Sequence, residues 1–469
     1  MNTDELVWAP ALELTARIRQ KEISPVEVVE AVLARIEALN PRLNAFCLIA
    51  ADQARAAARD AEVAVMKGEP LGPLHGVPMS LKDMIYTRGL RTTGGSRLFA
   101  DLIPEQDSVA AGRLKVAGAI LLGKTTTSEF GHKALTDSPM FGITRNPWDP
   151  TRTPGGSSGG AGAAIAAGLG PIALGGDGGG SIRIPAAFCG VFGFKPSYGL
   201  VPEYPGFPGW DHVSHTGPLT RTVRDAAAVL QVVAGSDDRD RLSLPGAAGD
   251  YVAACDRDVR GLHVAWSADL GYARVDPVVQ ALCENAAAEF ENLGCHVEVV
   301  NPLWENLEEP FVTMLAAQMH AAWGDQAAER EADVDPSFAK FLARGATIST
   351  REYLRARARM QEFWQEALQF LQRFDLLLTP TVSVLPFAAD GKPPREIEGE
   401  PISVLGWMPF TYPFNVTGQP AASVPAGWTA ENLPVGVQIV GQRHADAIVL
   451  AACAAYEAAS PWSERRPSL

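Results

Sequence analysis

Two glycine- and serine-rich clusters, joined by a segment of small residues, place the strongest constraint on how this chain can fold. The first reads Pro-Gly-Gly-Ser-Ser-Gly-Gly over residues 154–160, and the second reads Gly-Gly-Asp-Gly-Gly-Gly-Ser over residues 175–181. Residues 158–167 between them are expected to form a helix of small residues that packs closely on its neighbours. Either cluster alone would indicate a tight turn. Both together require close backbone approach at one place, and the glycines before Ser181 leave successive amides unshielded, as an oxyanion hole requires.

The surrounding sequence, from about residue 72 to 235, alternates short apolar segments with Gly-, Ser- and Pro-rich loops and small helices. Residues 119–122 are typical of a buried strand, and residues 222–233 are typical of a helix that Gly235 ends. This alternation predicts an α/β layer structure with a central sheet.

The rest of the chain contains no repeat and no low-complexity linker. A capping box at Ser24 begins a helix in the N-terminal part, and Asn40-Pro41 is expected to end it. The expected organisation is a single domain, 1–469, composed of an N-terminal helical segment, 1–70, an α/β core, 71–235 and 371–469, and a more helical segment, 236–370.

Composition and charge exclude several classes of protein. Apolar residues make up 47% of the chain and charged residues 20%, which is ordinary for a globular protein and excludes disorder. The formal net charge of −14 argues against nucleic acid or an anionic membrane as a partner. The N-terminus does not resemble a signal peptide, no stretch has the composition of a membrane span, and the six cysteines form no metal-binding cluster. We therefore expect a cytoplasmic protein with reduced cysteines and no metal.

Two local motifs match other enzyme classes but lack the required context. Residues 118–125 fit the P-loop pattern, yet the variable positions are Ala, Ile, Leu and Leu, which are strand residues, so Lys124 is interpreted as a solvated lysine at a strand end. Residues 156–160 fit G-x-S-x-G centred on Ser158. The preceding Thr-Arg-Thr-Pro-Gly cannot be a central strand, which argues against a Ser-His-Asp hydrolase.

In combination, the motifs of this chain resemble the amidase signature family of serine hydrolases. Besides the two glycine clusters, the matching segments are 76–83, 123–130, 193–196, 217–221, 375–380, 415–420 and 434–438. The resemblance is weak only in residues 240–370, which makes 236–370 a variable segment on the substrate side. It implies the family's fold, a central mixed, twisted β-sheet flanked on both faces by α-helices.

The resemblance also implies a Ser–Ser–Lys triad. When the roles in the family are assigned to the matching positions of this chain, Ser181 is the nucleophile, Ser157 is the bridging serine on a cis peptide bond, and Lys82 is the base. A serine hydroxyl becomes an effective nucleophile only when a base accepts its proton. Lysine can act as that base only when neutral, so burial must lower its pKa from about 10.4. The apolar residues around Lys82 in the sequence are consistent with such burial.

The oxyanion hole implied by the resemblance consists of the backbone amides around Gly178, Gly179, Gly180 and Ser181. Many members of the family carry a bulkier residue at the position of Gly178. Its absence here predicts a looser or wider site near the scissile carbonyl.

Four further residues are expected to support the triad. Asp177 and Arg183 are interpreted as residues that hold the catalytic groups in place, and Ser158 and Thr153 are expected to form hydrogen bonds around them. The implied reaction needs neither a metal nor an organic cofactor.

Aromatic residues in Pro- and Gly-rich loops suggest the substrate. Phe207, Trp210, Met408, Phe410 and Tyr412 are the candidate pocket residues. Exposed aromatic side chains in loops favour an apolar or aryl substrate over a small charged one. We expect hydrolysis of apolar or aryl amides, with carbamates (urethanes) and esters open to the same acyl chemistry, by a monomer or a homodimer.

Two alternatives remain open at this stage. The first is the glutamine-hydrolysing A component of a tRNA-dependent amidotransferase. That subfamily usually carries an aspartate seven residues before the asparagine equivalent to Asn415, whereas this chain has Met408. The second is a non-catalytic protein on the same fold, although all three triad residues are present.

Overall fold

A computed structural model describes residues 2–245 and 249–469. Over these residues, eleven strands form one mixed sheet in the order β1-β3-β2-β6-β8-β7-β14-β15-β11-β9-β10. These strands are β1 (Phe46–Ile49), β2 (Pro78–Lys82), β3 (Ile120–Thr125), β6 (Ile172–Gly176), β7 (Phe192–Lys195), β8 (Thr216–Thr220), β9 (His263–Trp266), β10 (His296–Val299), β11 (Leu376–Pro380), β14 (Ala421–Trp428) and β15 (Pro434–Gly441). Two small hairpins pair β4 (Asp137–Ser138) with β5 (Gly142–Ile143) and β12 (Glu396–Ile397) with β13 (Glu400–Pro401).

The helices of the described residues vary widely in length. They are α1 (Thr3–Trp8), α2 (Ala11–Arg19), α3 (Pro25–Leu43), α4 (Ala51–Lys67), α5 (Val109–Val116), α6 (Gly159–Ala166), α7 (Arg183–Cys189), α8 (Val223–Val233), α9 (Tyr251–Ala254), α10 (Pro277–Asn292), α11 (Glu308–Glu329), α12 (Pro336–Ala346), α13 (Thr350–Leu371), α14 (Pro413–Val416) and α15 (Asp446–Ala459), with 3₁₀ turns at Arg97–Phe99, Glu129–Gly131 and Glu331–Asp333.

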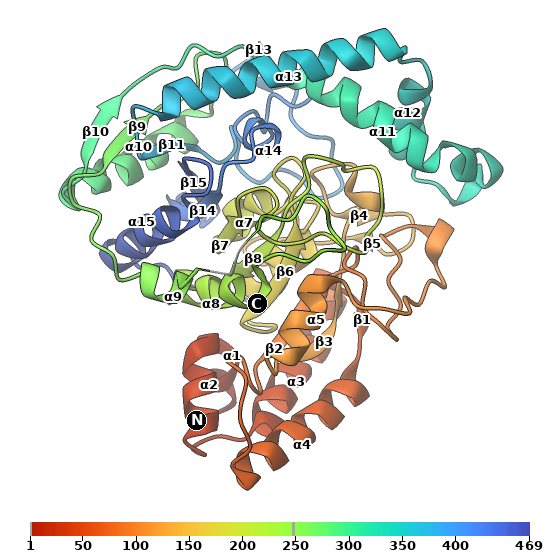
Figure 1. Cartoon of the computed structure of the whole chain (residues 1–469), viewed down its shortest axis with the longest axis vertical. Helices are drawn as coiled ribbons and strands as arrows, with labels where there is room; N and C mark the ends of the chain where they lie inside the picture. The colour runs from red at the N-terminus through yellow and green to blue at the C-terminus, as the bar shows by residue number, and fades with distance from the viewer. Residues whose placement is uncertain (1, 246–248) are drawn as a thin grey trace.

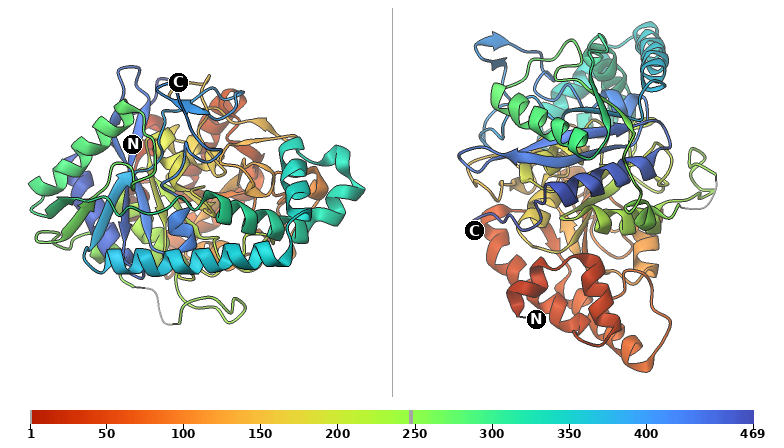
Figure 2. Two further views of the ribbon diagram at one scale, coloured as in Figure 1. Left: turned by 90° about the horizontal axis from the view of Figure 1, so that it is seen from above. Right: turned by 90° about the vertical axis from the view of Figure 1, so that its left-hand side faces the viewer.

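Helices cover both faces of the sheet, as expected for the amidase-signature fold (Figures 1 and 2). The short helices α6 and α7 contact each other and strands β6, β7, β14 and β15, whereas α8, α10 and α15 pack on β7, β8, β14 and β15 from the other side. Strands β2, β3 and β6 run parallel, so the C-terminal ends of β2 and β6 lie at the same edge of the sheet. Lys82 ends β2 and Gly176 ends β6, which brings the second glycine cluster next to the lysine.

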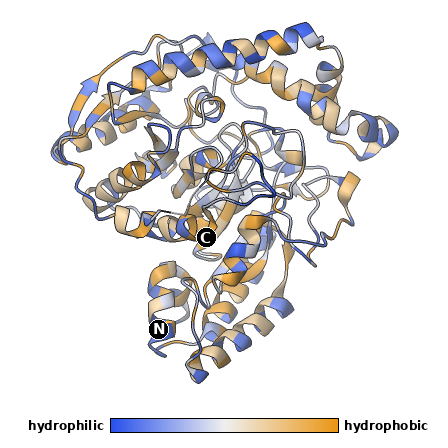
Figure 3. Ribbon diagram, viewed as in Figure 1, coloured by the Kyte–Doolittle hydropathy of each residue, from blue (hydrophilic) through white to orange (hydrophobic). Residues whose placement is uncertain are grey.

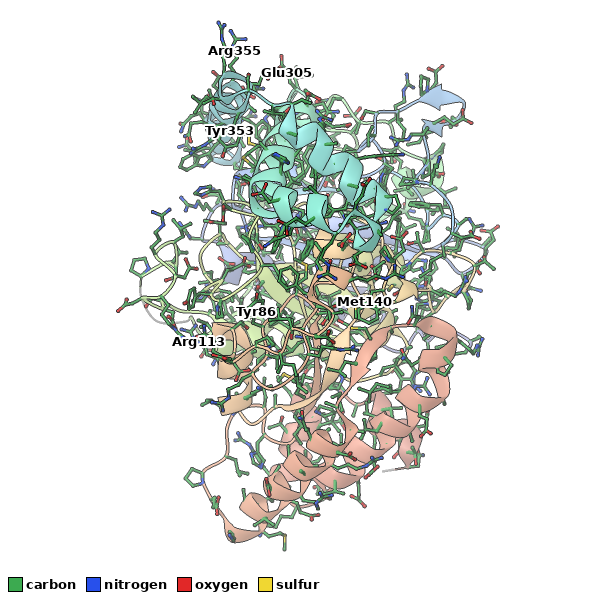
Figure 4. All side chains as sticks on the ribbon, turned by 90° about the vertical axis from the view of Figure 1, so that its right-hand side faces the viewer. Tyr86, Arg113, Met140, Glu305, Tyr353 and Arg355 are labelled. Atoms are coloured by element: carbon green, nitrogen blue, oxygen red, sulfur yellow. The ribbon has the colours of Figure 1, made fainter. Side chains whose placement is uncertain are left out.

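Two helical groups lie at opposite ends of the molecule (Figure 1). One consists of α1 to α4, and the other consists of α11 to α13; Tyr353 and Arg355, labelled in Figure 4, lie on α13. In Figure 3 these helices show hydrophilic and hydrophobic residues side by side, as expected of amphipathic helices with one buried face. No helix in the described part of the chain is long and apolar enough to cross a membrane.

The sheet is wider than the predicted core. Strand β1 comes from the N-terminal segment, and β9 and β10 come from the more helical segment, so both flanking segments contribute edge strands. The short apolar run Phe46–Ile49 falls inside the segment expected to be helical, but it forms a strand that pairs with β3, with Phe46 opposite Thr125.

The helix that begins at the Ser24 capping box does not end at Asn40-Pro41. The capping box itself is present, but α3 continues to Leu43 and contains Pro41. Proline near the last turn removes little hydrogen bonding. Asn40 Oδ1 instead accepts the amides of Ala45 and Phe46 at 2.9 and 2.8 Å, which fixes the turn after the helix.

Helix α6 packs closely enough that glycine is required at its start. A Cβ atom at Gly160 would lie 2.5 Å from the backbone nitrogen of Thr126 and 2.6 Å from the carbonyl oxygen of Ala45. Both neighbours are backbone atoms of the strand layer, so they cannot rotate away. The small residues recognised in the sequence therefore set the distance between this helix and the sheet.

We predict that Gly160→Ala destabilises the protein by about 2 kcal/mol or more, because the added methyl group must displace backbone. The matched control is Gly112→Ala in α5, where the nearest atom to a new Cβ is Asp107 Cβ at 3.7 Å. That change should be neutral or stabilising by up to about 1 kcal/mol, since alanine favours helices over glycine. Thermal unfolding of both variants checks this, and equal melting temperatures would contradict it.

Candidate active site

Lys82, Ser157 and Ser181 meet at the edge of the sheet where β2 and β6 end. Lys82 Nζ donates hydrogen bonds to Ser157 Oγ at 2.7 Å and to the carbonyl oxygen of Gly176 at 3.2 Å. Ser157 follows a cis peptide bond, Gly156–Ser157. Ser181 lies just before α7, and its carbonyl oxygen accepts the amide of Ser158 at 3.1 Å. Fold and loop geometry thus bring together three residues that lie 75 and 24 positions apart.

The electrostatic environment of Lys82 suits a base. Its side chain is 2% exposed, and burial lowers the pKa of the ammonium group to about 7, against the opposing effects of Asp177 and then Glu203. At pH 7 about half of the Lys82 side chains are therefore neutral, whereas an ordinary lysine is neutral in roughly one molecule in several thousand. The sequence-based expectation of a buried lysine agrees with this geometry.

Burial of a lysine does not by itself identify the base, because Lys124 and Lys195 are also fully buried. The prediction of a solvated Lys124 is wrong. Its Nζ donates to the carbonyl of Ile85 and to Thr87 and Thr92, and burial lowers its pKa to about 8 in spite of Asp83. Of these three lysines only Lys82 lines the cavity described below. Access to the cavity therefore distinguishes Lys82, the candidate base, from the two other buried lysines.

A buried ion pair holds the second glycine cluster. Arg183 Nη2 and Nε donate to the carboxylate of Asp177 at 2.9 and 3.0 Å, and both side chains are inaccessible to solvent. Burial alone would raise the pKa of Asp177, but Arg183 and then Asn415 lower it well below its usual range. Arg183 Nη1 also donates to Gln438 Oε1 at 2.7 Å and to the carbonyl of Thr411 at 2.9 Å.

Asn415 and Gln438 belong to segments that the sequence analysis matched to the family without giving them a role. Asn415 accepts from Arg183 at 2.6 Å and donates to the carbonyl oxygen of Asp177 at 2.8 Å. Gln438 lies on β15 and binds Arg183 from the far side. The sequence offers little signal for either role, because a polar side chain in these segments is recognisable as a partner of Arg183 only once the fold brings them together.

The glycine amides do not all face the cavity. Gly180 N donates to Asp177 Oδ1 at 2.7 Å, so this amide is engaged inside the protein, contrary to the prediction that it belongs to the oxyanion hole. Among the described residues, the amides of Gly178, Gly179 and Ser181 have no hydrogen-bond acceptor. Gly178 and Ser181 also line the cavity. Their amides are therefore the candidate donors for an oxyanion.

Ser158 and Thr153 brace the first cluster. Ser158 Oγ donates to the carbonyl of Gly176 at 3.1 Å, and its amide binds Ser181, so it connects the two clusters directly. Thr153 Oγ1 accepts the amide of Gly155 at 3.1 Å, which fixes the turn that leads to Ser157.

A cavity of about 400 Å³ opens beside the triad. Phe207 and Trp210 are among its lining residues, as the aromatic loop suggested. Met408, Phe410 and Tyr412 are not. All three are buried, with at most 4% exposed, and Tyr412 stacks on the ring of Phe311. The sequence could not separate these residues from the loop residues, because aromatic side chains fill both pockets and cores.

Trp210 occupies the space that Gly178 leaves free. A Cβ at Gly178 would lie 2.5 Å from Trp210 Cζ3, and the indole nitrogen is fixed by a hydrogen bond to the carbonyl of Phe130 at 2.8 Å. The prediction of a looser site is therefore wrong. Because residue 178 is glycine, the ring of Trp210, which comes from another loop, fills the volume that a side chain at position 178 would occupy.

His212 and His215 are spaced as His-x-x-His in the sequence, but they do not form a site. His212 lies exposed on a loop, whereas His215 is buried and binds the carbonyl of Val213 at 2.8 Å. Over residues 2–245 and 249–469, no group of three or more His, Cys, Asp or Glu residues could hold a metal ion.

Comparisons with known proteins agree with this geometry. The family model for amidases matches residues 27–450. An acylamidase from Rhodococcus erythropolis is 39% identical over 100% of this chain and 99% of its own. The A component of the glutamyl-tRNA(Gln) amidotransferase from Moorella thermoacetica is 36% identical over 99% of both chains.

Solved structures give the same result. A bacterial aryl acylamidase of the amidase signature enzymes superposes with a TM-score of 0.92 at 37% identity and 97% coverage of both chains. A 6-aminohexanoate cyclic dimer hydrolase, complexed with substrate, superposes with a TM-score of 0.90 at 32% identity, covering 98% of this chain and 99% of its own. This chain therefore belongs to the amidase family, in its amidase signature fold, and is a hydrolase of carbon–nitrogen bonds other than peptide bonds.

Proposed function

We propose that the protein is an acylamidase that cleaves apolar or aryl amides through an acyl-enzyme on Ser181. The observation that carries this proposal is the 2.7 Å hydrogen bond between Lys82 Nζ and Ser157 Oγ at the wall of a cavity that also contains Ser181. Phe207 and Trp210 on the same wall support an apolar or aryl substrate group.

In the proposed mechanism, neutral Lys82 accepts the proton of Ser157 as Ser157 accepts the proton of Ser181. The Ser181 oxygen attacks the substrate carbonyl, and the amides of Gly178 and Ser181 bind the oxyanion. The carbon–nitrogen bond breaks as the proton returns from Lys82 through Ser157 to the leaving nitrogen. Water then hydrolyses the ester on Ser181 by the same proton route, releasing the acid.

Carbamates and esters are proposed as further substrates, because the same steps cleave any acyl group with an acceptable leaving group. Glutamine hydrolysis as part of an amidotransferase is the second candidate, supported by the 36% identity to the protein from Moorella thermoacetica. Met408 is buried with 4% exposed and offers no carboxylate, and no arginine among the described residues lines the cavity to hold an α-carboxylate. Both observations favour the acylamidase.

We predict that the protein hydrolyses an aryl anilide, an aryl carbamate or a p-nitrophenyl ester and that Ser181→Ala abolishes this activity. Initial rates on these substrates and on glutamine, with and without the variant, check the prediction. Turnover of glutamine alone would favour the amidotransferase, and full activity of Ser181→Ala on any substrate would refute the assigned nucleophile.

We predict that kcat/KM for a neutral anilide falls about tenfold per pH unit below pH 7 and is level above it. Only neutral Lys82 can accept the proton, and its pKa is about 7, so acid removes the active form. Lys82→Arg should be inactive at every pH, because a guanidinium stays charged. A flat profile between pH 5.5 and about 9 would contradict the role of Lys82.

We predict that Gly178→Ala lowers kcat/KM for the anilide by about tenfold or more, since the methyl group collides with the fixed indole of Trp210. Adding Trp210→Ala should restore part of the loss. A double-mutant cycle on kcat/KM measures this coupling. Strictly additive effects of the two substitutions would show that the residues do not compete for space.

A further inference from the structure

The catalytic cavity carries an excess of negative charge that the proposed reaction does not use. Among its lining residues in the described part of the chain, Glu203, Asp211 and Asp240 are acidic, whereas Lys82 is the one lysine or arginine. Lys82 is about half neutral at pH 7 in this environment. An anionic substrate group would therefore be repelled, and a cationic group attracted.

The three acids differ in what they can do. Asp240 is engaged by the backbone, because its two carboxylate oxygens accept the amides of Glu203 and Leu242, both at 2.9 Å. Glu203 has its own amide fixed in this way, and its Oε1 accepts from Thr216 Oγ1 at 2.9 Å. The backbone and the side chain of Glu203 are thus both held in place before any ligand binds.

No described residue forms an ion pair with Glu203 within 4 Å. The buried carboxylate of Asp177, by contrast, is neutralised by Arg183 at 2.9 Å. Protein packed around Glu203 raises the pKa of its carboxyl group, opposed by hydrogen bonds from Ser214 and Thr216; among the charges nearby, Asp240 raises this pKa and Lys82 lowers it. Glu203 is thus an exposed, positioned carboxylate with no ion-pair partner within 4 Å on the wall of the catalytic cavity, and such a carboxylate can bind a cation.

We propose that Glu203 is a specificity-determining residue that binds an ammonium group, or another cationic nitrogen, on the amide substrate. Tyr198, Tyr204, Phe207 and Trp210 line the same cavity and supply aromatic faces, which also attract cations. The favoured substrate class is then an apolar or aryl amide with a positive charge at a distance from the scissile bond. This inference rests on the proposed acylamidase function and refines its substrate class.

The test uses two pairs of isosteric anilides. The first pair varies the acyl group and consists of the 4-nitroanilides of 5-aminopentanoic acid and hexanoic acid. The second pair varies the aniline part and consists of 4-(aminomethyl)acetanilide and 4-ethylacetanilide. The readout is the ratio of kcat/KM for the charged and neutral members, measured at about pH 8, where Lys82 is mostly neutral. The neutral member of each pair reports any general loss of activity.

In at least one pair, wild-type protein should prefer the charged member, and Glu203→Gln should reduce this preference at least about tenfold, mainly through KM. Glutamine keeps an oxygen that can accept from Thr216. Asp211→Asn is the matched control, because it removes an exposed charge from the same cavity and should retain most of the preference. Equal losses in both variants would show a diffuse field and overturn the assignment to Glu203.

Calorimetric binding of the same compounds to Ser181→Ala separates this inference from the proposed function. If the wild-type protein does not hydrolyse the anilides although they bind, the proposed function fails. The ratio of binding constants for the charged and neutral compounds on Ser181→Ala, and its loss in the Ser181→Ala, Glu203→Gln double variant, still decide the inference. If the neutral anilides are hydrolysed but neither pair shows a preference that depends on Glu203, the inference is overturned and the acylamidase assignment stands.

Discussion

The buried ion pair between Asp177 and Arg183 is the interaction on which the arrangement of the site depends. It turns the amide of Gly180 inward, connects the end of β6 to the start of α7, and reaches Asn415 and Gln438 in the C-terminal part of the chain. Removal of one partner from such a pair costs about 3–5 kcal/mol, because the other charge is left buried. The position of Ser181 and the fold around it are therefore maintained by the same contacts.

Desolvation lowers the pKa of two lysines of similar burial, Lys82 and Lys124, but only one of them lines the cavity. At Lys124, three oxygen acceptors surround the nitrogen away from the cavity, so the residue supports the loop after β2. At Lys82 the acceptors include a serine on the cavity wall, so a lowered pKa can be used in proton transfer. Whether a buried lysine can act as a base thus depends on which groups accept hydrogen bonds from its nitrogen and on whether substrate can reach those groups.

The cavity combines aromatic walls with unbalanced negative charge. Gly178 and Trp210 share one volume, so the wall nearest the oxyanion donors comes from a loop rather than from the oxyanion segment. Glu203 lies in the same loop region, fixed by Asp240 and Thr216.

The sequence by itself determined the α/β class and the close packing of α6, because glycine spacing and local motifs are properties of neighbouring residues. The triad candidates came from the resemblance of several motifs to the amidase signature family. Tertiary structure alone decided the rest. The place of strand β1 in the sheet is known only from its pairing with β3, and Tyr412 resembles a pocket residue until its burial is known. Burial, pairing and charge balance arise between segments that are distant in the chain. Nothing in the sequence therefore indicates that Glu203 belongs to the site, and only its place on the cavity wall does so.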